Sequence, residues 1–226
     1  MAKKLYEESN IRAIAEAIRA KNGKTETYTT AQMAGAIADI TAGGGGGTTI
    51  DDLMNGTAAA VNLPTATKIL QYAFYKKTAI ESVTMPNVTA IETYAFYQCS
   101  NLEAANLPDN LASIGERAFM QCSNLVISTL PSALTVISKN AFYGCNSIKK
   151  LTIPSNIATI QSNAFYSCGS LAELTFAGTP TTIDTSAFGA CLNLKKINVP
   201  WAEGAVAGAD TKWGATNATI YYNYKG

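Results

Sequence analysis

The feature that most constrains the fold of this chain is an internal repeat of 22 or 23 residues. An Ala-Phe pair recurs six times, and an isoleucine lies four residues before each Ala. From the second copy on, a cysteine lies three residues after each Phe. A repeat of this length is typical of a solenoid, because one turn cannot bury its apolar side chains until further turns stack on it. The sequence therefore predicts coils of about 23 residues whose equivalent side chains form ladders.

The repeated positions also predict the core, because equivalent residues should lie above one another at the strand spacing of roughly 4.8 Å. The core set is the aromatic ladder Phe96, Phe119, Phe142, Phe165 and Phe188, the thiol ladder Cys99, Cys122, Cys145, Cys168 and Cys191, and the isoleucines Ile114, Ile137 and Ile160.

Each coil also contains a short extended segment that mostly ends in proline, such as LEAANLP at 102–108 and IKKLTIP at 148–154. Its apolar residues follow the pattern L-x-x-L-x-L, although Ala105 and Ser128 weaken the middle position in two copies. Period-two spacing favours a strand, and proline ends it. We therefore expect a mainly β fold in which these strands form a parallel sheet on the concave side.

The cysteines raise the question of chemistry, because a cysteine could be a nucleophile, a metal ligand, half of a disulfide or part of the core. All five recur at one repeat position, and the chain has no histidine to complete a metal site. In-register side chains roughly 4.8 Å apart point the same way, whereas a disulfide requires Cβ atoms nearer about 4 Å. We interpret the cysteines as small buried side chains, with redox sensitivity and catalysis as less favoured alternatives.

The pattern C-x-x-L-x-x-L-x-L-P-x-x-L-x-x-I-x-x-x-A-F resembles the leucine-rich repeats of the BspA-like, or treponemal, class over residues from about 58 to 200. Proline is missing at Ala177, and one residue is deleted in the turn between Met85 and Ile91. The resemblance implies a leucine-rich-repeat solenoid with a parallel concave sheet. It also implies a non-enzymatic recognition module for surface adhesion or for host or matrix binding, without supplying a ligand.

The two ends of the chain differ from the repeat. Residues 1–42 are predicted to form a short α-helical hairpin for attachment or oligomerisation, and 43–49 a glycine-rich linker. The solenoid is expected over 50–200 and a C-terminal cap over 201–226. The segments NIRAIAEAIRAKNGKTETYTTAQMAGAIADI and NVPWAEGAVAGADTKWGATNATIYYN resemble tail-associated proteins of phages and prophages of Gram-positive bacteria. That resemblance implies a virion-associated protein, whose hairpin contacts identical copies or a virion partner; docking on the first coil is the alternative.

Composition excludes several classes of function. The formal net charge is +1, so no overall field attracts nucleic acid or an anionic membrane. No apolar run approaches the roughly 18 residues that membrane insertion requires. Without histidine, and without a nucleophile beside a base or a metal-ligand spacing, we expect no enzyme, no cofactor and no metal site. The N-terminus lacks the apolar segment of a signal peptide, so we expect synthesis in the cytoplasm and release in a virion or by lysis.

Two exposed surfaces are candidates for ligand binding. One is a column of outward hydroxyl and amide groups on the strands, formed by Thr84, Asn106, Thr129, Thr152, Thr175 and Asn198. The other is a stripe that follows the inward Phe residues, formed by Tyr75, Tyr97, Tyr143 and Tyr166. Threonine also suits a solvated strand, and stacked tyrosines could equally be a protective ladder or a platform for sugar or protein.

Charge could orient a partner beside the hydroxyl column, because it changes from Glu81 and Glu103 to Lys149, Lys150, Lys195 and Lys196 along the axis. The favoured function is recognition of an extended cell-surface glycan or protein. The alternatives are a structural scaffold in an assembly and a bacterial surface adhesin of the BspA type.

Overall fold

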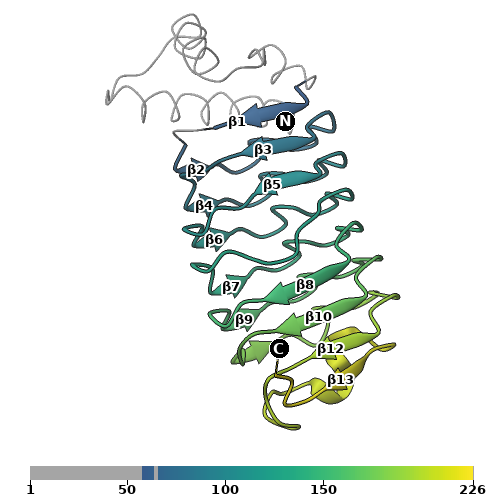
Figure 1. Cartoon of the computed structure of the whole chain (residues 1–226). Coiled ribbons are helices and arrows are strands. Elements are labelled where there is room, and N and C mark those ends of the chain that lie inside the picture. The colour runs from purple at the N-terminus through teal and green to yellow at the C-terminus, as the bar shows by residue number, and fades with distance from the viewer. Residues whose placement is uncertain (1–57, 64–65, 226) are drawn as a thin grey trace, which may run out of the picture.

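The structure, a computed structural model, describes residues 58–63 and 66–225. The hairpin predicted for 1–42 and the linker predicted for 43–49 lie outside these residues. Figure 1 shows a single column of stacked coils that runs from β1 to β13. All paired strands are parallel, which confirms the mainly β solenoid. Within the described residues the one helix is η1 (Ala209–Gly214), a 3-10 helix.

The coils place strands on two sides of the column. The long-strand face consists of β1 (Ala60–Asn62), β3 (Ser82–Thr84), β5 (Ala104–Asn106), β8 (Lys150–Ile153), β10 (Glu173–Phe176), β12 (Lys196–Asn198) and β13 (Thr219–Tyr221). The short-strand face consists of two-residue strands, namely β2 (Lys68–Ile69), β4 (Ala90–Ile91), β6 (Ser113–Ile114), β7 (Val136–Ile137), β9 (Thr159–Ile160) and β11 (Thr182–Ile183). The long strands are those that the L-x-x-L-x-L segments predict, whereas the short strands were not anticipated.

The aromatic ladder fills the space between the two faces. Successive Phe rings from Phe74 to Phe188 stack nearly parallel, with centroids 5.0, 5.1, 5.5, 5.1 and 5.5 Å apart. These distances are close to the strand spacing of roughly 4.8 Å, as expected for side chains at equivalent positions. All the predicted core residues are buried, including the five cysteines and the isoleucines of the repeat.

The cysteines do more than fill space. Each thiol donates a hydrogen bond to the Phe carbonyl of the preceding coil, from Cys99 to Phe74 O (2.9 Å) through Cys191 to Phe165 O (3.1 Å). All five are free thiols. Burial raises the pKa of the Cys99 thiol to about 12 and also raises the pKa of Cys145. The thiols of Cys99 and Cys145 therefore stay protonated and inert near neutral pH.

The long-strand face is interrupted at one coil. Strands β1, β3 and β5 form one sheet and β8, β10, β12 and β13 another, and only the bridge between Thr129 and Thr152 represents the intervening coil. At this coil the middle leucine of the pattern is Ser128, which is exposed, while Ile127 is only 9% exposed and enters the core instead. Since side chains alternate along a strand, this one-residue shift is incompatible with the register of β5.

The C-terminal segment extends and covers the last coil. Strand β13 pairs with β12, and the Phe188 N–H donates to Trp213 O (2.9 Å). Trp213 is fully buried against Phe176 and Trp201, and its indole N–H donates to Ala207 O (2.9 Å). The aromatic side chains of this segment thus cover the end of the Phe ladder.

Candidate functional site

The hydroxyl column lies on the long-strand face, as the sequence places it, but it is not uniformly open. Thr84, Asn106, Thr129 and Thr152 are exposed, and Thr175 is half-buried. Asn198, in contrast, is fully buried, and its amide donates to Glu173 Oε1 (3.1 Å) and Thr175 Oγ1 (3.0 Å). The column available to a ligand therefore ends near Thr175.

The basic half of this face is partly neutralised by one carboxylate. Glu173 accepts Lys196 Nζ at 3.0 Å and Lys150 Nζ at 3.1 Å. Hydrogen bonds from Lys196, Lys150 and Asn198 lower the pKa of Glu173 to about 2. Of the predicted basic residues, Lys149 and Lys195 remain exposed without an ion pair among the described residues.

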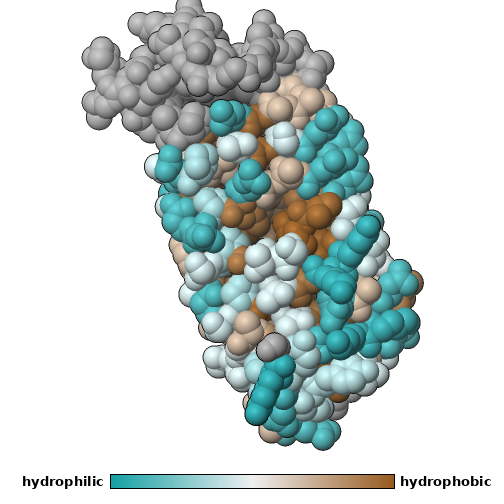
Figure 2. All heavy atoms as spheres, in the orientation of Figure 1, coloured by the Kyte–Doolittle hydropathy of each residue, from teal (hydrophilic) through white to brown (hydrophobic). Residues whose placement is uncertain are grey.

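An apolar patch separates the acidic and basic halves. Figure 2 shows hydrophobic side chains gathered between the positions of β5 and β8, with hydrophilic surface on either side. This is the interrupted coil, where Val126 is 63% exposed at the position that Glu103 and Lys149 hold in the neighbouring coils. An extended ligand along this face would therefore meet acidic, apolar and basic surface in turn.

The predicted tyrosine stripe exists as two stacked pairs. Tyr75 stacks on Tyr97 at 4.9 Å, and Tyr143 stacks on Tyr166 at 5.2 Å, and all four are half-buried. Met120 lies between the pairs in sequence. The stripe ends at Gly189, where a Cβ would lie 2.7 Å from the Tyr166 ring.

A second row of tyrosines was missed from the sequence. Tyr72 stacks on Tyr94 at 5.2 Å, and Arg117 Nη1 in the next coil donates to the Tyr94 hydroxyl (2.7 Å). The rings of Tyr94 and Tyr97 pack edge to face with their centroids 5.4 Å apart, so the second row contacts the tyrosine stripe. The available signal was the triplet Tyr-Ala-Phe, which occurs only in the first two coils.

This second row occupies a strained backbone position. Tyr72, Tyr94 and Arg117 have φ values of 61°, 59° and 56°, where the next two coils have Asn140 and Asn163. Asparagine adopts this left-handed conformation readily, whereas for other residues with a side chain the conformation costs roughly 1–2 kcal/mol per residue. Bulky residues that persist in such a conformation often mark functional positions.

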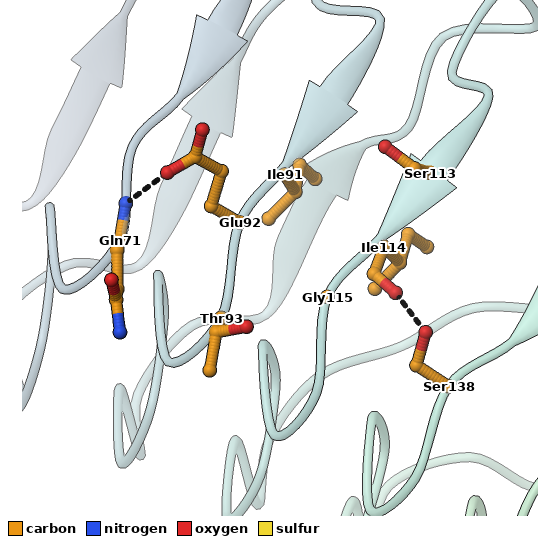
Figure 3. Close-up of a pocket in the computed structure, with 8 residues that line it drawn as sticks. All are labelled: Gln71, Ile91, Glu92, Thr93, Ser113, Ile114, Gly115 and Ser138. Carbon is orange, nitrogen blue, oxygen red and sulfur yellow. Dashed lines mark hydrogen bonds between the residues drawn. The ribbon is translucent and has the colours of Figure 1, made fainter.

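A hollow of about 340 Å³ opens on the short-strand face, and its residues Gln71 and Thr93 directly precede Tyr72 and Tyr94 in the chain. It is lined by Gln71, Ile91, Glu92, Thr93, Ser113, Ile114, Gly115 and Ser138. Figure 3 shows these residues coming from four successive coils, with Glu92 accepting the Gln71 N–H (3.0 Å) and Ser138 donating to Ile114 O (2.6 Å). The sequence placed the repeat isoleucines Ile91 and Ile114 in the core, but none of the other residues of this lining was singled out from it.

Metal-ligating side chains are not clustered in the described part of the chain. There, no three His, Cys, Asp or Glu side chains are placed together so that they could hold a metal ion. In the same part of the chain, no helix has the length and apolar character needed to cross a membrane. What the described surface offers is hydroxyl, amide and aromatic groups.

Comparison with known proteins identifies the family. The model of the BspA type leucine rich repeat region matches residues 67–195, in six copies. The chain therefore belongs to the BspA-type leucine-rich-repeat family.

Solved structures of bacterial repeat proteins resemble the chain. A leucine-rich repeat protein from Bacteroides ovatus is 30% identical over 62% of this chain and 39% of its own, with a TM-score of 0.54. A leucine rich cell surface protein from Faecalibacterium prausnitzii is 29% identical over 62% of this chain and 38% of its own, with a TM-score of 0.55. A T. pallidum leucine rich repeat protein is 28% identical over 63% of this chain and 72% of its own, with a TM-score of 0.56.

The aligned region spans less than half the length of the first two of these proteins. No curated protein matches the chain.

Proposed function

We propose that this chain is a non-enzymatic recognition module that binds an extended cell-surface ligand, a glycan or a protein, along its long-strand face. The observation that carries the proposal is the open hydroxyl column, since Thr84, Asn106, Thr129 and Thr152 are exposed at the same position of successive coils. A surface that repeats its chemistry at every coil suits a ligand that repeats too, because several weak contacts then form at once.

Family membership and the tyrosine pairs support this role. One similar structure is named a cell surface protein, which favours a surface ligand for this chain as well. The half-buried Tyr143 and Tyr166 offer a second platform, because a tyrosine ring contacts apolar surface while its hydroxyl forms hydrogen bonds.

A virion association is the second part of the proposal. It rests on the resemblance of the terminal segments to phage and prophage tail-associated proteins. Residues 1–42 would then join identical copies or a virion partner. Deleting residues 1–47 is expected to leave a folded, monomeric solenoid that no longer self-associates, as measured by light scattering and circular dichroism. A deleted chain that unfolds would show instead that the segment is a cap of the first coil.

The recognition surface is tested with two charge-matched variants. Thr84→Lys with Thr129→Lys places two lysines on the long-strand face, and Val136→Lys with Thr182→Lys places two lysines equally far apart on the short-strand face. All four positions are exposed, so the thermal melts should barely change. Fluorescently labelled protein is titrated onto cells that the wild type coats.

Weaker attachment of the long-strand variant, with the short-strand variant unchanged, supports the proposal. Tyr143→Ala with Tyr166→Ala should weaken attachment too if the stripe takes part. If every variant attaches like the wild type, recognition does not use these surfaces, and the scaffold function becomes the better explanation.

A further inference from the structure

A column of side chains on the short-strand face has a gap. The residues that directly follow the isoleucine of each coil are Leu70, Glu92, Gly115, Ser138, Gln161 and Asp184. Gly115 has no side chain and Ser138 has a short one, so the hollow opens at these two coils. Nothing larger fits at position 115, because a Cβ there would lie 2.5 Å from Thr93 N. The gap is therefore built into the backbone.

The ladder of the short-strand face is also broken at this point. In neighbouring coils this residue donates its own N–H to the isoleucine carbonyl of the preceding coil, as Glu92 does to Ile69 O (2.8 Å) and Gln161 to Ile137 O (2.9 Å). Between the coils of Ile114 and Ser138, the Ser138 hydroxyl makes this bond instead. Accordingly β6 pairs with β4 and β7 pairs with β9, but β6 and β7 belong to different sheets.

One backbone donor at the hollow has no acceptor among the described residues. The Gln71 N–H donates to the Glu92 carboxylate of the next coil (3.0 Å), and the Lys139 N–H donates to Gln161 Oε1 of the next coil (2.9 Å). The Thr93 N–H occupies the equivalent position, and so do the N–H groups of Glu116, Ser162 and Thr185, and no described residue accepts any of these four. Of these four residues, only Thr93 lines the hollow, where its N–H is open to water or to a ligand oxygen.

The chemistry of the lining indicates what the hollow could take. Thr93, Ser113 and Ser138 contribute hydroxyls, Gln71 an amide and Glu92 a carboxylate, and the lining contains no cation. Hydroxyls donate and accept, and a carboxylate accepts, which together match a ligand rich in hydroxyl groups. The single carboxylate disfavours an anionic ligand. A volume of about 340 Å³ is at the small end of ligand pockets, enough for a short saccharide segment.

We propose that this hollow is a second binding site, which takes a neutral saccharide. The inference rests on the proposed function, because the saccharide would be one component of the surface ligand. The hollow then binds one sugar unit on the short-strand face, while the long-strand face binds the extended polymer. Tyr94, which has a positive φ and accepts a hydrogen bond from Arg117, directly follows Thr93 in the chain.

The test is a nuclear magnetic resonance titration of the intact, ¹⁵N-labelled protein. The probes are cellotetraose, maltotetraose and chitotetraose, which are neutral, and tetragalacturonate, which is anionic. We expect at least one neutral probe to shift the amide signals of Thr93 and Gly115, with weaker binding of tetragalacturonate. Ser113→Lys should weaken that binding by at least about tenfold. Thr159→Lys, the equivalent change in β9, is the matched control and should leave it unchanged.

The proposal is overturned if no neutral probe shifts these amides, if tetragalacturonate binds more tightly, or if the two lysine variants bind alike. These results are separable from the proposed function. Should the saccharide fail to bind while the Thr84 and Thr129 variant still loses attachment to cells, only the second site is refuted.

Discussion

Phe142 lies in the middle of the aromatic ladder, and replacing it with alanine tests the core. Its side chain is fully buried, and its ring stacks on Phe119 at 5.5 Å and on Phe165 at 5.1 Å. Burying an aromatic ring removes roughly 150–250 Å² from water, worth about 4–6 kcal/mol at about 25 cal/mol per Å². Measured Phe→Ala losses of about 3–5 kcal/mol agree with this range.

The surrounding backbone has little freedom to close the resulting cavity. The Phe142 N–H donates to Ala164 O (2.8 Å), and the Cys168 thiol donates to Phe142 O (3.3 Å). Because two hydrogen bonds tie this residue to the following coil, we expect a loss in the upper part of the range. The free-energy cost of the cavity would be smaller if the surrounding side chains could move in to fill it.

The assay is urea unfolding followed by circular dichroism, with Tyr143→Ala as the control. That substitution removes a neighbouring ring that is only half-buried and stacks on Tyr166 alone, so we expect a loss of about 1 kcal/mol. An unchanged denaturant slope would show that the difference is one of stability. A loss below about 1 kcal/mol for Phe142→Ala would refute the stacked ladder.

Three further predictions follow from individual contacts. The five buried thiols should resist alkylation in the native protein and react together on unfolding, and rapid labelling of any one of them would contradict their burial. The hydrogen bonds that lower the pKa of Glu173 stabilise the fold at pH values above the ordinary pKa of 4.5, and this stabilisation is lost as the pH falls to about 2. Glu173→Gln should therefore flatten the dependence of the unfolding free energy on pH over that window. Identical pH profiles for the variant and the wild type would disprove the contribution. Gly115→Ala should cost about 1–3 kcal/mol because its Cβ would overlap the backbone of the preceding coil, whereas Gly169→Ala, with its nearest neighbour at 3.2 Å, should cost less; equal melts would contradict the close approach.

The repeat made most of the fold predictable from the sequence. Phe142 and Cys145 recur with their equivalents at a fixed period, and only stacked coils explain such recurrence. The short strands were not predictable in the same way, because a two-residue strand such as Val136–Ile137 is too short to show a period. The weak position at Ser128 was visible in the sequence, but the entry of Ile127 into the core in its place was not.

The surfaces were harder to predict, because they depend on where the repeat stops or changes. Asn198 shares the position of the exposed Thr152, yet it is buried, and its strand β12 is paired with an additional strand, β13, whose sequence lacks the repeat pattern. The hollow depends on two coils in which one column loses its long side chains. Spacing identified the residues of that column, but the close backbone approach at Gly115 exists only in three dimensions.

The central claim is that recognition follows the repeat along the long-strand face, and the dependence of affinity on ligand length tests it most directly. Surface polymer purified from cells that the protein coats is cut into fragments of graded length, and each fragment is titrated against the intact protein by calorimetry. The exposed column from Thr84 to Thr152 crosses three coil steps, roughly 15 Å at the strand spacing. Affinity per fragment should rise steeply until the fragment spans this distance and then level off. Equal affinity for the shortest and the longest fragments would show that a single local site carries the binding, and would contradict the account.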